Sequence, residues 1–210
     1  MFIFNDAQKM RALRRLVFWH IVIIAASNYL VQFPFTIWGI SNTWGAFTFP
    51  FIFLTTDLTV RIFGQSMARK IIFWAMFPAL LLSYVISVAF QNGTWTGQFF
   101  IWDIFVFRIA FASFAAYAVG QLLDITVFNR LRRLKQWYIA PASSTVLGSA
   151  ADGAVFFFVA FYHSTDPFMA ANWIPIACAD YAVKIFISTL FFLPAYGVVL
   201  NILSRRIAFA

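Results

Sequence analysis

The sequence predicts an all-α protein, an integral membrane bundle of six transmembrane helices that forms a single domain over residues 1–210. The first observation behind this prediction is composition: 63% of the 210 residues are hydrophobic, 21% are aromatic and only 10% are charged. Soluble domains average about 45–50% apolar and about 25% charged residues. A soluble core of this size would not bury so much apolar surface, so most of it must face lipid. At about 20 residues per span, the length leaves no room for a sizeable extramembrane domain.

The second observation is that six apolar stretches are each long enough to span a bilayer. The first follows a basic stretch that begins at Lys9. It is too long for the hydrophobic region of a cleaved signal peptide, so we expect it to remain as the first helix. The last stretch is long enough to tilt or to break near Pro175 or Pro194. The expected spans are residues 16–33, 45–63, 71–90, 101–122, 141–161 and 173–203.

The third observation is the distribution of positive charge. Most of the 15 basic residues precede the first span or follow the second, fourth and sixth spans, whereas the intervening loops contain none. By the positive-inside rule, the basic loops and both termini are cytoplasmic. The basic run at residues 130–135 would suit either an anionic partner or anionic lipid, and lipid is the simpler interpretation. We therefore expect the lipid bilayer, and no nucleic acid, to be the partner of these charges.

Several ionisable side chains fall inside the expected spans. A charge at that depth is costly, so it normally faces the bundle interior and has a partner or lines a pathway. Asp57 and Arg61 are four residues apart, as are Asp180 and Lys184, so each pair lies on one helix face. Asp103 lies near the expected outer surface.

Asp152 has no cation at helical spacing, so we expect Arg108 or Lys184 to reach it across the bundle. The buried charges have two interpretations: ion pairs that hold the helices in register, or a polar cavity near the middle of the membrane. The set as a whole favours the cavity. The candidate substrate-binding residues are Asn28, Asp57, Arg61, Tyr84, Arg108, Asp152, Asp180 and Lys184.

Residues for enzyme chemistry are scarce. His20 and His163 are expected on opposite sides of the membrane, where neither can serve the other, and Cys178 is the single cysteine. The sequence contains no Gly-rich phosphate-binding loop and no Gly-Xaa-Ser-Xaa-Gly nucleophile elbow. We therefore expect no enzymatic activity, no metal site and no cofactor.

Six segments carry a resemblance to a known family. They are residues 27–34 (SNYLVQFP), 43–51 (TWGAFTFPF), 55–64 (TTDLTVRIFG), 78–87 (PALLLSYVIS), 120–124 (GQLLD) and 180–184 (DYAVK). In these segments the chain resembles the queuosine-precursor transporters of the vitamin uptake transporter family of bacterial inner membranes. The resemblance implies import of 7-cyano-7-deazaguanine, with its 7-aminomethyl relative as an option, for salvage into queuosine in tRNA. It also implies a likeness to the substrate-binding subunits of energy-coupling-factor importers, which share a six-helix arrangement.

The candidate residues suit the substrate that the resemblance implies. A deazaguanine ring offers adjacent N–H and NH₂ donors, which a carboxylate accepts, and a carbonyl oxygen, to which a cation donates. Asp57 or Asp152 would take the donor edge, and Arg108 or Lys184 would take the carbonyl. Tyr84 is one of several aromatic candidates for stacking on the ring.

Three hypotheses for function stay open at this point. The first is a stand-alone carrier that alternates access around a mid-membrane site and needs no ATPase partner. The second is a substrate-binding subunit of an energy-coupling-factor-type importer for another vitamin or nucleobase-like solute. The third is an assembly protein whose charged residues serve only subunit contacts. A homodimer is a further expectation.

Overall fold

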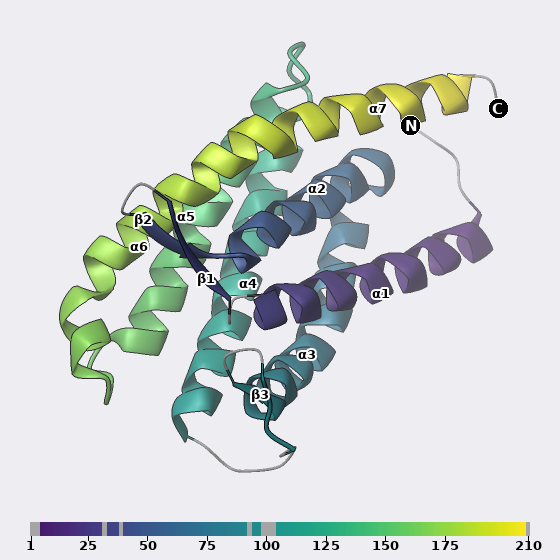
Figure 1. Cartoon of the computed structure of the whole chain (residues 1–210). Coiled ribbons are helices and arrows are strands. Elements are labelled where there is room, and N and C mark those ends of the chain that lie inside the picture. The colour runs from purple at the N-terminus through teal and green to yellow at the C-terminus, as the bar shows by residue number, and fades with distance from the viewer. Residues whose placement is uncertain (1–4, 31–32, 38–39, 92–93, 98–103, 209–210) are drawn as a thin grey trace.

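A computed structural model gives the structure of the chain and describes residues 5–30, 33–37, 40–91, 94–97 and 104–208 (Figure 1). The architecture is helical, as predicted. The helices are α1 (Asp6–Leu30), α2 (Gly45–Phe63), α3 (Gln65–Ala89), α4 (Ile104–Leu131), α5 (Ile139–Phe161), α6 (Pro167–Ile187), the π-helical segment η1 (Ser188–Phe192) and α7 (Leu193–Ala208).

Two short antiparallel hairpins interrupt the helical architecture. Strand β1 (Pro34–Ile37) pairs with β2 (Ile40–Thr43), and β3 (Phe90–Gln91) pairs with β4 (Thr94–Trp95). Apart from Phe90, the last residue of an expected span, both places lie in loops between the expected spans. Their aromatic and β-branched residues favour an extended backbone, but segments this short carry no clear alternating pattern.

Among the residues that the structure describes, four helical segments are long and apolar enough to cross a membrane. They are α3, α4, α5 and the continuous segment Pro167–Ile202, which contains α6, η1 and the first part of α7. The six-span topology with cytoplasmic termini stays a prediction.

The helices extend beyond several of the expected spans. Helix α2 has the expected bounds, but α1 and α3 begin earlier than expected, and α4 continues to Leu131 rather than ending at residue 122. The expected bounds are those of the apolar stretches, whereas a helix satisfies its own backbone hydrogen bonds and can continue into polar flanking residues. The longer α4 brings Asp124, which was expected outside the span, into the buried part of the bundle.

The last helical segment, which begins at Pro167, changes its hydrogen bonding near Pro194. Helix α6 passes Pro175 without ending. The π-helical turn η1 ends two residues before Pro194, and the N–H of Leu193 donates to the carbonyl of Ser188, five residues earlier. Because Pro194 has no N–H, it cannot continue the ordinary α-helical pattern. The irregularity expected near Pro194 therefore takes the form of a π turn.

A polar layer lies between two apolar clusters of the bundle. One cluster contains Ala112 of α4 and Phe161 of α5, and the other contains Phe128 of α4 and Ala140 of α5. Between these levels, the same two helices bury polar side chains: Gln121, Asp124, Ser144, Thr145, Ser149 and Asp152. This layer holds the candidate functional site.

Candidate functional site

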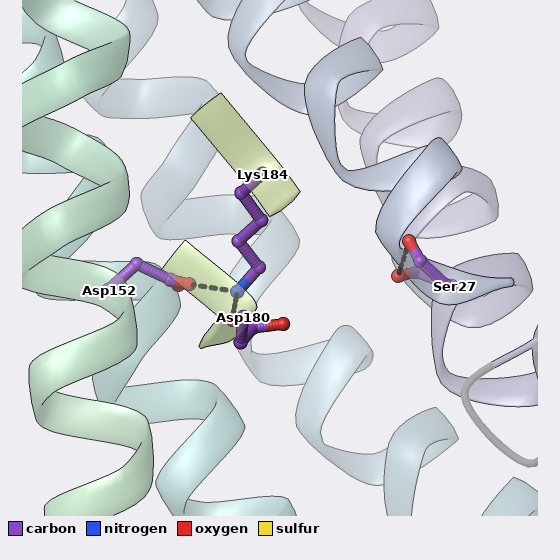
Figure 2. A network of polar contacts seen from close by, with 5 residues as sticks. Ser27, Asp152, Asp180 and Lys184 are labelled. Atoms are coloured by element: carbon purple, nitrogen blue, oxygen red, sulfur yellow. Dashed lines mark hydrogen bonds and ion pairs between the residues drawn. The ribbon is translucent and has the colours of Figure 1, made fainter. Parts of the chain in front are cut away.

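The ammonium group of Lys184 lies between two carboxylates (Figure 2). Its Nζ atom is 2.8 Å from Asp180 on the same helix and 3.4 Å from Asp152 on α5. The side chains of Lys184, Asp152 and Asp180 are only 12%, 10% and 19% exposed. The predicted Asp180–Lys184 pair is confirmed, and Lys184 is the cation that reaches Asp152 across the bundle. We call these three residues the charged triad; with all three ionised, it carries one net negative charge.

Two glycines lie near Asp152, one at an open position of α5 and one in close contact from α4. Gly153 is buried, yet a Cβ atom placed on it would meet no atom within 4 Å. Gly120 of α4 lies on the other side, and a Cβ there would be 2.8 Å from the Cβ of Asp152. Asp152 of the triad therefore stands at a tight crossing of α4 and α5, and the next residue of α5, Gly153, has open space at its Cβ position.

The crossing is reciprocal. A Cβ atom on Gly148 of α5 would lie 3.1 Å from the Cβ of Asp124 on α4, just as one on Gly120 would meet Asp152. Each helix thus contributes a Gly-Xaa-Xaa-Xaa-Asp segment, residues 120–124 and 148–152, and packs its glycine against the aspartate of the other. Small residues of this kind let helix backbones approach closely in membranes.

Asp124 and Asp57 form a second acidic group, of which only Asp57 was among the candidate residues. The hydroxyl of Ser144 donates to Asp57 at 3.3 Å, and Asp124 is an electrostatic neighbour of Asp57. Asp57 and Asp124 are both fully buried. Asp124 was missed because the fourth span was expected to end before it. The repeated spacing from Gly120 and Gly148 was the sequence signal that could have identified it.

Arg61 does not form the predicted ion pair with Asp57. Within the described residues, its guanidinium group lies over the rings of Phe128 and Tyr196, 5.5 Å from each centroid, and its Nη2 donates to the carbonyl of Trp137 at 3.4 Å. The prediction was wrong because spacing on one helix shows only which side chains can meet. The aromatic surfaces of α4 and α7 offer this cation another partner.

Arg108, near the start of α4, contacts the backbone at the carboxyl-terminal end of α5. Its guanidinium donates to the carbonyls of Val159, at 2.8 Å, and of His163, at 3.3 Å, and also to the carbonyl of Tyr162. The last carbonyls of a helix lack intrahelical donors. Val159 is one of these last residues of α5, and Tyr162 and His163 directly follow the helix, so the donors of Arg108 are used by the backbone at this helix end.

Asn28 and Tyr84 lie at the contact between α1, α3 and α4. The amide of Asn28 donates to the hydroxyl of Ser83, and the ring of Tyr84 packs edge-on to Phe107. Ser27, drawn in Figure 2, donates to the carbonyl of Gly45 at 3.4 Å, and no contact joins it to the triad in that view. The structure therefore brings three of the eight candidates together. Asp103 lies outside the described residues.

In the described part of the chain, no group of three or more His, Cys, Asp or Glu side chains is arranged to hold a metal ion. The chemistry that the triad offers is hydrogen bonding from one ammonium and acceptance by two carboxylates. Such a set suits a small polar solute that carries both donors and an acceptor on one edge.

Comparisons with known proteins give a consistent result. Residues 43–199 match a family model described as "Putative vitamin uptake transporter". The chain is 58% identical over 219 residues to the "Probable queuosine precursor transporter" of Haemophilus influenzae, covering 98% of this chain and 93% of that protein. It is 54% identical over 208 residues to the "Queuosine precursor transporter" of Escherichia coli, covering 98% and 94%. A Bacillus subtilis protein named "Probable queuosine precursor transporter" is 26% identical over 180 residues, covering 81% and 77%. No solved structure matches.

Proposed function

Because the chain belongs to the vitamin uptake transporter family, we propose that it carries queuosine precursors, 7-cyano-7-deazaguanine above all, into the cell. The family and the apolar helices identify a multi-pass transporter of the bacterial inner membrane, not an enzyme. The substrate is part of the proposal. Its support is the name carried by relatives that are more than half identical over nearly the whole chain.

The charged triad is the observation that carries the proposal. A guanine-like edge presents a carbonyl oxygen beside an N–H and an NH₂ group. Lys184 would donate to the carbonyl, and Asp152 would accept from the two adjacent donors. Binding would then exchange part of the Lys184–Asp152 contact, 3.4 Å long in the structure, for contacts with the substrate. Asp180, at 2.8 Å, would keep the ammonium in place.

The open space at Gly153, the residue that follows Asp152 on α5, supports placing the ring at this level of the helix. Asp57 is a weaker candidate for this contact. It accepts from the hydroxyl of Ser144, and no ion pair joins it to a described cation that would donate to the carbonyl of the substrate. Arg61 and Arg108 leave the proposed site. The guanidinium of Arg61 lies over the rings of Phe128 and Tyr196, and that of Arg108 donates to backbone carbonyls at the end of α5.

For the transport cycle we propose six spans with cytoplasmic termini and alternating access around the triad, without a dedicated ATPase. The triad lies between apolar clusters at two levels of the bundle, which would separate the site from either side in turn.

Uptake in a defined strain tests this proposal. The host should be unable to make queuosine precursors and should lack energy-coupling ATPase modules, and the readout is queuosine in tRNA at limiting external 7-cyano-7-deazaguanine. Expression of the chain should restore queuosine, whereas Asp152→Asn, at equal membrane abundance, should restore much less. Restoration only when energy-coupling modules are supplied would make the chain a substrate-binding subunit. No restoration with or without them, despite normal abundance, would contradict the proposed substrate.

A further inference from the structure

A groove of about 560 Å³ opens between the first half of α3 and the middle of α4, away from the charged triad. Its polar wall comes from α3 and includes Gln65, Ser66, Arg69 and Lys70. Its apolar wall includes Trp74 of α3 and Leu122 of α4. The groove therefore joins a cationic end to an apolar surface along one outer face of the bundle.

The positive charge at this groove has no described protein partner. Arg69 and Lys70 are both exposed, and among the described residues neither makes an ion pair with a carboxylate. Helix α3 also begins without an acidic residue in its first turn and without a side-chain cap. Cations close to the positive end of a helix dipole are electrostatically unfavourable. An anion in the groove would relieve both effects.

The apolar wall shows which anion fits. Phe73 and Trp74 are 54% and 60% exposed, and an indole ring favours the level of the lipid headgroups. A free inorganic anion would use the cationic end and leave these rings uncovered. An anionic phospholipid would use both walls, because one molecule carries both a phosphate and acyl chains.

We propose that this groove is a binding site for an anionic phospholipid, with the phosphate at Arg69 and Lys70 and an acyl chain along Phe73 and Trp74. The site lies at the end of α3 that the charge distribution assigns to the cytoplasmic side, where anionic headgroups attract basic side chains. This inference does not depend on which solute the protein transports.

Thermal unfolding of the purified full chain in neutral detergent tests the site. Phosphatidylglycerol and phosphatidylcholine with identical acyl chains are titrated into the parent protein, the double variant Arg69→Gln/Lys70→Gln, and a control. The control, Arg133→Gln/Lys135→Gln, removes the same charge from two exposed residues that do not line the groove. Phosphatidylglycerol should stabilise the parent and the control alike. Its apparent affinity should fall roughly tenfold or more in the groove variant, since two cations near the headgroup are lost.

A second measurement needs no variant. Native mass spectrometry of the parent with equal amounts of the two lipids should show retention of phosphatidylglycerol in preference to phosphatidylcholine. Equal retention of both lipids, or an equal loss of affinity in the two double variants, would overturn the proposal. So would stabilisation by inorganic phosphate that displaces the lipid, because the groove would then be an anion site without the apolar contribution.

Discussion

Asp152 of α5 packs directly against Gly120 of α4, so closely that a Cβ atom on the glycine would lie 2.8 Å from the Cβ of the aspartate. The carboxylate that we assign to substrate binding is therefore positioned by a helix crossing. Its partner contact, Asp124 against Gly148, repeats this arrangement on the other side of the same crossing. The geometry of the site thus depends on how closely α4 and α5 approach.

Substitution of the crossing glycine tests this dependence. Gly120→Ala should destabilise the protein by about 1–3 kcal/mol, because the added methyl group overlaps Asp152 and the helices must separate. The measurement is thermal unfolding in detergent. Gly153→Ala is the matched control, since its methyl group would meet no atom within 4 Å, and it should be neutral or slightly stabilising. Equal effects of the two changes would show that the crossing is not tight.

A larger side chain at Gly153 should block the site without unfolding the protein. Gly153→Leu would extend into the open space at this position, one residue from Asp152. We expect the affinity for 7-cyano-7-deazaguanine to fall roughly tenfold or more, while Gly153→Ala binds almost normally. Calorimetry on the purified variants measures both. A leucine variant with the affinity of the parent would mean that the ring does not occupy this space.

The charges of the triad predict an asymmetry between two neutralising variants. Lys184→Gln leaves two carboxylates in a mostly buried site with no cation, whereas Asp180→Asn leaves the balanced pair of Lys184 and Asp152. Removing one partner from a buried pair costs about 3–5 kcal/mol, so Lys184→Gln should unfold at a markedly lower temperature than Asp180→Asn. The reverse order would show that the net negative charge assigned to the triad is wrong.

Arg108 should act on stability rather than on binding. Arg108→Lys keeps the positive charge but cannot reach all three carbonyls at the end of α5. We expect a loss of about 1–3 kcal/mol in stability, measured by thermal unfolding, with substrate affinity of the folded fraction unchanged. A large loss of affinity in well-folded protein would return Arg108 to the substrate site.

Sequence patterns predicted those features of the molecule that are local. The apolar stretch gave the bounds of α2, and the four-residue spacing gave the Asp180–Lys184 pair. The same spacing failed for Asp57 and Arg61, because residues on other helices decide which partner a side chain meets. Asp124 was missed because hydropathy marks apolar stretches and not the helix end.

The most direct test of the account compares Asp152→Asn with the parent for binding of 7-cyano-7-deazaguanine by calorimetry. Asparagine has nearly the same size and its carbonyl can still accept from Lys184, so the variant should fold. Asp6→Asn is the control, because Asp6 is a fully exposed aspartate at the start of α1. The account predicts roughly tenfold or greater loss of affinity for Asp152→Asn, since one charge-assisted hydrogen bond is weakened, and none for the control. Binding of folded Asp152→Asn with the affinity of the parent would contradict the assignment of the charged triad as the substrate site.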